Sequence, residues 1–210
     1  IFTVTVAATD QPSGATVDST DEGEYTDGTA GTVDVTSGHI YRTELDTNMS
    51  TYRWGALYGN VTGTIVLGDD DDDRLFEWTA AGRLVYASED ATPSWDTLAD
   101  ATAADMSAYM EGAFSDNYTT TFDEASENIG SGIFEALTSD FAYTYNNLGA
   151  DTWQTYSLKD GEDDLVWVGK VSEDGTSYKN TVADYQMIVP EDGTDGDETA
   201  TTYNLWVELI

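Results

Sequence analysis

Hydrophobic and polar positions alternate at the start of the chain. Residues 1–8 place Phe2, Val4, Val6 and Ala8 on one side and mainly threonine on the other. Alternation with a period of two, in β-branched residues, is typical of a strand with one buried face. The sequence therefore predicts an N-terminal strand, and the residues that it would offer to a partner are Ile1, Phe2, Val4, Val6 and Ala8.

A polar segment separates this strand from the rest of the chain. Residues 9–32 are rich in Thr, Asp, Gly, Ser and Glu, a composition that predicts an acidic, flexible linker. An apolar strand on such a linker can pair in one of two places. It pairs within its own domain, or it reaches a neighbouring molecule.

Residues 33–210 carry further strand patterns, divided by acidic turns. Residues 52–58 alternate, and after a bulge at Gly59-Asn60 the pattern continues to Leu67. Residues 75–78 and 84–87 form a candidate hairpin. Other candidate strands are residues 141–145, 153–158, 165–168, 181–189 and 203–210. Strands this short and evenly spaced predict a mainly β domain, an antiparallel β-sandwich of the Ig-like or jelly-roll-like kind.

A helical insertion is expected at about residues 94–137. Ser94 is a candidate N-cap for a helix that runs from Trp95 to Met110. Residues 123–137 predict a second, weaker helix, since each of its two glycines costs a helix about 1 kcal/mol. We expect this insertion to cover one edge or face of the sheets.

The charge balance indicates the habitat. The chain has 41 acidic residues and 7 lysines and arginines, which makes its formal net charge −34. Such a surface repels itself at ordinary ionic strength, whereas in molar salt the Debye length falls to about 3 Å. The sequence therefore predicts a halophilic protein. Seven cations are too few for a groove that follows phosphates, so nucleic acids and anionic membranes are excluded as partners.

The rest of the composition favours a folded, exported protein. Hydrophobic residues make up 40% of the chain and aromatic residues 12%, enough for a core despite the acidity. No cysteine is present, and no apolar run approaches the ~20 residues that direct membrane insertion needs. The sequence starts at Ile1 in an apolar stretch, as a secreted product does after removal of its signal, although a trimmed sequence would look the same. Asn48, Asn60 and Asn117 are candidate N-glycosylation sites of an extracellular glycoprotein.

Three acidic loops are candidates for cation binding. Residues 69–73 and 160–164 lack the spacing of a calcium loop and are better interpreted as solvated turns. The loop at 191–198 has glycines that permit tight turns, so Asp192, Asp195 and Asp197 are the candidate ligands for Ca²⁺ or Mg²⁺. No other cofactor is predicted.

Catalytic signals are weak. His39 is the only histidine, no G-x-S-x-G motif is present, and 41 acids do not single out a catalytic pair. The sequence therefore predicts a protein that is not an enzyme, with an exported hydrolase as a remote alternative. Trp54, Tyr58, Trp78 and Tyr86 could stack on a sugar, but their strand spacing favours core and cross-strand pairs.

Two resemblances add to this interpretation. Residues 52–65, 75–78 and 85–88 resemble segments of exported archaeal surface proteins. The N-terminal strand and its linker resemble subunits of archaeal extracellular filaments assembled by donor-strand complementation, in which one subunit's N-terminal strand completes the sheet of the next. A type IV pilin is disfavoured, because pilins begin with a long apolar helix.

The resemblance implies a structural subunit at a haloarchaeal cell surface, with itself as partner through residues 1–8. A monomeric adhesin or a cation-dependent carbohydrate-binding module, in contact with the cell surface or a glycan, is the alternative from another class. An S-layer or viral coat subunit is a further structural alternative.

Overall fold

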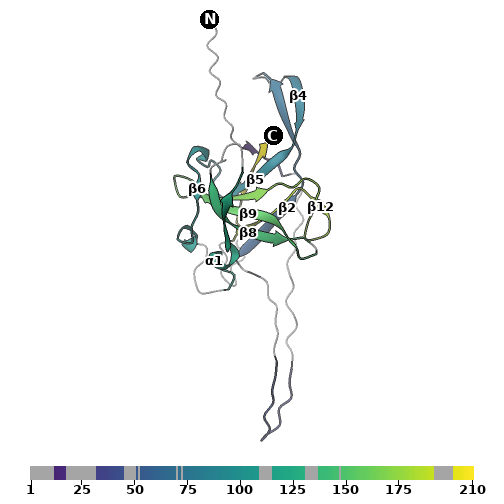
Figure 1. Cartoon of the computed structure of the whole chain (residues 1–210), viewed down its shortest axis with the longest axis vertical. Coiled ribbons are helices and arrows are strands. Elements are labelled where there is room, and N and C mark those ends of the chain that lie inside the picture. The colour runs from purple at the N-terminus through teal and green to yellow at the C-terminus, as the bar shows by residue number, and fades with distance from the viewer. Residues whose placement is uncertain are drawn as a thin grey trace.

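The computed structural model describes residues 12–17, 32–44, 51, 53–69, 71, 73–108, 115–130, 137–146, 148–191 and 201–210. Within these residues the protein is mainly β, with antiparallel sheets and one short α-helix, as in a β-sandwich-like fold (Figure 1). This confirms the fold class that the sequence predicts.

One large antiparallel sheet organises the body. Its strands follow the order β1-β14-β5-β10-β9-β8-β7, and the short strand β6 also pairs with β9. Their bounds are Ser13–Gly14 (β1), Asn204–Leu209 (β14), Gly82–Ser88 (β5), Leu165–Lys170 (β10), Asp151–Lys159 (β9), Thr138–Tyr145 (β8), Glu124–Asn128 (β7) and Ala99–Asp100 (β6).

Three strand pairs of the described residues lie outside this sheet. Strand β13 (Tyr185–Pro190) pairs with β2 (Trp54–Gly59), and β11 (Gly175–Thr176) pairs with β12 (Val182–Ala183). The third pair is a hairpin of β3 (Gly63–Gly68) and β4 (Arg74–Ala80). The β2–β13 pair packs on one face of the large sheet, so it forms a partial second layer of the sandwich.

Both faces of the large sheet are buried, as its central strand shows. Leu165 and Trp167 of β10 join the core under β2 and β13, whereas Val166 and Val168 join the core on the opposite face. Trp95 belongs to this second core, so the 94–98 segment covers that face. A strand buried on both sides is apolar throughout, which is why β10 reads Leu-Val-Trp-Val without alternation.

The helical insertion differs from its prediction. In place of a helix from Trp95 to Met110, the structure has two 3₁₀ turns, Trp95–Thr97 and Asp105–Ala108, with strand β6 between them. The Ser94 side chain makes no capping hydrogen bond. The only α-helix among the described residues is α1 (Tyr118–Thr121), and the predicted helix at 123–137 begins instead with strand β7. Pairing with β9 and β8 outweighs helix propensity here, because it satisfies the backbone and buries Ala101 and Ile129.

The predicted hairpin of residues 75–78 and 84–87 is wrong. Strand β4 pairs with β3, and β5 pairs with β14 and β10. The acidic run at 69–73 closes the β3–β4 hairpin, as the interpretation of this run as a solvated turn implies: the Asp69 carboxylate accepts hydrogen bonds from the backbone N–H groups of Asp71 and Asp73. The continuous strand expected through Gly59-Asn60 also divides there, because β2 pairs with β13 while β3 leaves the body.

Residues 12–17 of the predicted linker of residues 9–32 are among the described residues. Pro12 is buried, and Ser13 and Gly14 pair with Val207 and Trp206 of β14. Residues 32–44, most of which the sequence assigned to the sandwich, are exposed and contain no strand. They project at the end of the molecule opposite β4 (Figure 1).

Candidate functional site

One end of the body carries a projecting hairpin. Strands β3 and β4 extend away from the sheets beside the C-terminus (Figure 1), and residues 64–68 and 74–79 are exposed. The register places Ile65 opposite Trp78 and Leu67 opposite Phe76, so these four side chains share one face. We call them the hairpin face. Their exposed fractions are 47% for Ile65, 50% for Leu67, 56% for Phe76 and 47% for Trp78.

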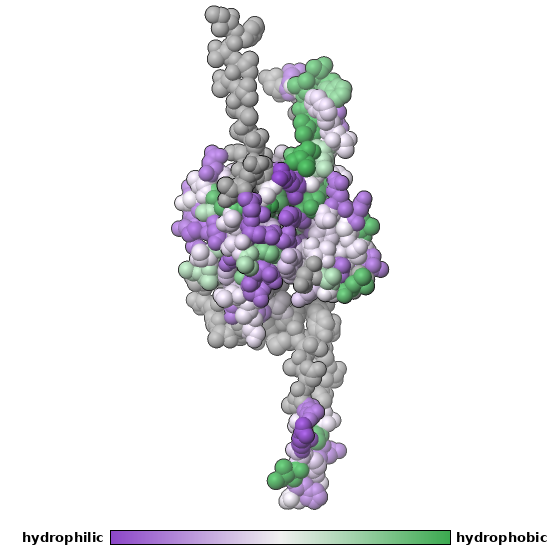
Figure 2. All heavy atoms as spheres, viewed as in Figure 1, coloured by the Kyte–Doolittle hydropathy of each residue, from purple (hydrophilic) through white to green (hydrophobic). Residues whose placement is uncertain are grey.

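The root of this hairpin is fixed to the body. A Cβ on Gly63 would lie 2.3 Å from the Leu209 side chain of β14, so this side chain packs directly on the Gly63 backbone. Ala80, at the other side of the root, is buried. The hairpin therefore contacts the end of β14 at its root. The rest of the hairpin is exposed to solvent, and much of its surface is hydrophobic (Figure 2).

The N-terminal segment meets the body at the same end. Ser13 and Gly14 run antiparallel to β14, and the Ala15 N–H donates to the Leu205 carbonyl at 2.8 Å. Followed back from Ala15 to Pro12, the chain therefore runs toward Leu209 and the hairpin root. The sequence did not decide whether the last strand is central or at an edge. Among the described residues, the two residues of β1 are the strand that pairs with β14 on its outer side.

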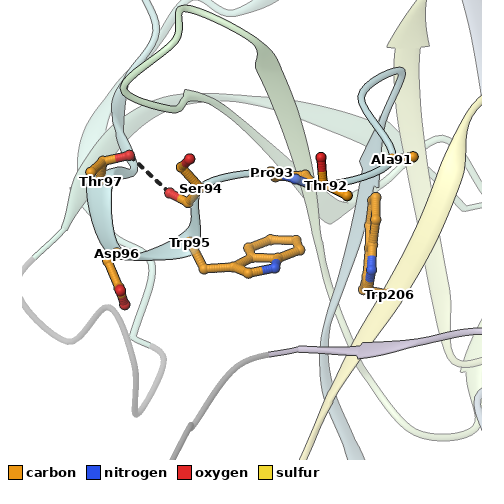
Figure 3. Close-up of a pocket in the computed structure, with 8 residues that line it drawn as sticks. All are labelled: Ala91, Thr92, Pro93, Ser94, Trp95, Asp96, Thr97 and Trp206. Carbon is orange, nitrogen blue, oxygen red and sulfur yellow. Dashed lines mark hydrogen bonds between the residues drawn. The ribbon is translucent and has the colours of Figure 1, made fainter.

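A second candidate site is a hollow on the body of about 480 Å³. It is lined by the loop from Ala91 to Thr97 and by Trp206 (Figure 3). The indole rings of Trp95 and Trp206 meet edge to face, with centroids 5.2 Å apart. Trp95 is 9% exposed, so mainly Trp206 presents ring surface to a ligand.

The buried carboxylate of Asp160 holds this loop in place. Its Oδ2 accepts a hydrogen bond from the Ser94 N–H at 2.9 Å, and its Oδ1 accepts from the N–H groups of Glu162 and Asp164 at 2.8 and 3.1 Å. Burial acts to raise the pKa of Asp160, but these three donors together hold it below its usual value. Asp160 is therefore an organising anion of the site, not the solvated turn residue that the sequence predicts.

Asp90, Asp160 and Asp164 form a carboxylate cluster beside the hollow. One oxygen from each lies within 4.8 Å of the others. Burial, followed by repulsion from Asp160, Asp90 and Asp163, raises the pKa of Asp164. Oxygen ligands grouped in this way suit Ca²⁺ or Mg²⁺, whose charge would relieve that repulsion. Sequence reasoning missed Asp90, because it is 70 positions from Asp160 and only the packing of the two loops joins them.

Most of the site residues that the sequence predicts belong neither to the hairpin face nor to the hollow and its carboxylate cluster. Residues 1–8, Asn48 and the candidate ligands Asp192, Asp195 and Asp197 lie outside the described residues. Asn60 is exposed between β2 and β3, whereas Asn117 caps α1 by accepting a hydrogen bond from the Thr120 N–H. His39 is exposed, and its ring lies beside that of Tyr41.

The four aromatic residues do not form one platform. Tyr86 is buried and Trp54 packs against the core, as predicted. Tyr58 meets Tyr178 edge to face. Trp78 is the exception, because it stands on the exposed hairpin face.

Comparison with protein-family models, curated proteins and solved structures found no match for this chain. Among the described residues, no helix has the length and apolar character needed to cross a membrane.

Proposed function

We propose that this protein is a structural subunit of an extracellular filament of a halophilic archaeon. Subunits polymerise head to tail when residues 1–8 of one add as a β-strand to the next. The observation that carries the proposal is the end of the large sheet: β14 stops at Leu209, and its neighbour β5 starts at Gly82 at the same level. Strand β1 pairs Ser13 with Val207 and Gly14 with Trp206, so the chain that precedes Ser13 is directed toward this end of the sheet.

The energetics of strand donation suit the pattern of residues 1–8. Main-chain hydrogen bonds to a sheet edge supply affinity, and alternate side chains supply specificity. Burial of Phe2, Val4 and Val6 in a neighbour would stabilise the contact by about 1.5–3 kcal/mol for each side chain. The two ends of the molecule differ, since one bears the hairpin and the other residues 32–44 (Figure 1). A contact between unlike ends is heterologous and propagates as an open filament unless it closes into a ring.

Deletion of residues 1–8 should abolish filaments. We expect the intact chain to form them in about 2 M salt, where repulsion between acidic bodies is screened, and the deleted chain to stay monomeric and folded. Electron microscopy and light scattering measure this. The sharper variant changes Phe2, Val4 and Val6 to serine, and its matched control changes Thr3 and Thr5 to serine on the opposite side of the strand. Filaments from the variant with three serines would refute strand donation.

A second candidate function is a cation-dependent carbohydrate-binding module. The specific observation in its favour is the carboxylate cluster next to the Trp206 hollow, joined through the hydrogen bond from Ser94 to Asp160. In this function the cation would order the 90–97 loop, and a sugar ring would stack on Trp206.

This candidate predicts a specific effect of Ca²⁺ on stability. At about 100 times its Kd, Ca²⁺ should stabilise the fold by about 2.7 kcal/mol and raise the Tm by roughly 5–10 °C over NaCl of equal ionic strength. Asp164→Asn should remove this rise, since Asp164 belongs to the cluster. Asp163→Asn is the matched control on the same turn, where φ of 69° suits asparagine. Equal Tm values in the two salts would exclude the candidate.

A further inference from the structure

The loop between β2 and β3 presents an asparagine in an acceptor motif for sugars. Asn60, Val61 and Thr62 fit the pattern N-x-[ST], which marks an N-glycosylation acceptor on the surface of a secreted protein. Asn60 and Thr62 are exposed, and Val61 between them is half-buried. The amide that would be modified and the hydroxyl that completes the motif are therefore both accessible in the folded protein.

Asp184 fixes the backbone on both sides of Asn60. Its N–H donates to the Gly59 carbonyl at 2.8 Å, and its Oδ2 accepts a hydrogen bond from the Val61 N–H at 2.8 Å. These two bonds hold the loop without using the Asn60 side chain. A group attached to the Asn60 Nδ2 would therefore break neither of them.

An aromatic side chain precedes Asn60 at the spacing of a strand. Tyr58 lies two positions earlier in β2, and side chains at this spacing share one side of an extended chain, roughly 7 Å apart. The half-buried Tyr58 ring meets the Tyr178 ring edge to face, with centroids 5.2 Å apart. A neighbour in this geometry covers at most one face of a ring. Tyr58 therefore offers ring surface within reach of the first sugar on Asn60.

The acceptor motif at Asn117 is held in a different way. The Asn117 Oδ1 accepts a hydrogen bond from the Thr120 N–H at 3.1 Å and so caps α1. Tyr118, the middle residue of this motif, is 5% exposed, and Thr119 lies within the helix. A transferase that takes up this motif would have to open the helix, losing the cap and the burial of Tyr118.

We propose that Asn60 carries an N-linked oligosaccharide whose first sugar packs on the Tyr58 ring, and that Asn117 stays unmodified. The donor is an oligosaccharide linked through phosphate to a membrane lipid. The Asn60 Nδ2 forms a bond to the anomeric carbon, while the bond from that carbon to the phosphate oxygen breaks. The lipid phosphate leaves with the electron pair, and a base of the transferase takes the amide proton. This inference rests on the extracellular location in the proposed function, but not on filament assembly.

Peptide mass spectrometry of the full chain tests the assignment, with the chain secreted by a haloarchaeal host that glycosylates its own surface protein. Thr62→Ala removes the acceptor motif and keeps Asn60. Thr64→Ala is the matched control, because Thr64 is an exposed threonine outside the motif. We expect a sugar on at least about half of the Asn60 copies in the intact chain and in the control, and on none in Thr62→Ala.

Two outcomes of this experiment overturn the assignment. An unmodified Asn60, in a culture where the host's own surface protein is modified, overturns the site. Modification of Asn117 to the same extent as Asn60 overturns the selection between the two motifs. Both results come from the intact chain, so they do not depend on the folding of a variant.

A double-mutant cycle tests the contact with Tyr58. In chains secreted by the same host, Thr62→Ala should lower the Tm by roughly 2–4 °C, because the chain no longer carries a sugar that packs on the ring. In a Tyr58→Leu background the same substitution should lower the Tm by less than about 1 °C. A direct effect of Thr62 is common to both backgrounds, so equal losses overturn the contact.

Electron microscopy of the same secreted protein keeps this inference apart from the proposed function. Filaments in which Asn60 is unmodified overturn the glycan and leave the proposed function standing. A modified Asn60 in a chain that does not assemble supports the glycan and overturns the filament.

Discussion

We expect transfer of this protein from about 2 M to 0.1 M KCl to lower its Tm by roughly 6–12 °C. The cause is uncompensated repulsion among 41 acidic residues. Most of the cations already have partners: Arg42, Arg53, Arg74, Lys159 and Lys170 each pair with a carboxylate. If about ten close pairs of surface carboxylates cost ~0.3 kcal/mol each without screening, the loss is about 3 kcal/mol.

The control separates charge screening from the general strengthening of apolar burial by salt. A variant with Asp123→Asn, Glu162→Gln and Glu173→Gln removes three exposed charges and should show a shallower dependence of Tm on KCl. Differential scanning calorimetry from 0.1 to 2 M KCl measures both chains. Parallel curves for the two chains, or a Tm that does not depend on salt, would contradict this explanation.

Trp167→Ala should destabilise the fold by about 3–5 kcal/mol. Trp167 is 1% exposed at the centre of the large sheet, and its ring lies 6.1 Å from that of Trp54 and 5.5 Å from that of Phe122. It therefore joins three parts of the molecule: strand β10, the second layer through β2, and the residue that follows α1. Removal of the indole leaves a cavity that these elements do not fill by collapse, since each is fixed by its own hydrogen bonds.

Trp78→Ala is the matched control for this substitution. Trp78 is 47% exposed on the projecting hairpin, so its loss should cost less than about 1 kcal/mol in a dilute, unassembled sample. Denaturant unfolding followed by circular dichroism in molar salt compares the two. Equal losses would mean that Trp167 does not hold the layers together. A large loss for Trp78→Ala would mean that the hairpin is packed within its own subunit.

The sequence predicts the fold class well because strand periodicity is a local property. Alternation and turn residues are visible along 5 to 10 residues, and they identified β2, β9, β10, β13 and β14 before any packing was considered. The acidic turn of residues 69–73 was also correctly placed between strands. The net charge needs no structure, and the salt dependence that we expect follows from it.

The pairing of the strands, in contrast, could not be predicted from local periodicity. Leu75 to Ala87 reads as a compact hairpin, but β4 and β5 leave Ala81 in different directions and pair with β3 and β14. Local pattern carries no information about partners distant in sequence, since any apolar strand can face any other. The helices expected at 95–110 and 123–137 failed for a related reason, because pairing with β9 and β8 overrode local propensity.

For the candidate sites, too, some features follow from the sequence and others only from the tertiary structure. The sequence by itself determined the acidic surface, the apolar alternation of residues 1–8 and the absence of cysteine chemistry, because composition and period are properties of the chain alone. Only the tertiary structure decided that Asp90 meets Asp160 and Asp164, that β14 ends where the N-terminal segment enters, and that Ile65, Leu67, Phe76 and Trp78 face solvent. Burial depends on what packs against a side chain, and the described part of this chain leaves each of these four about half exposed.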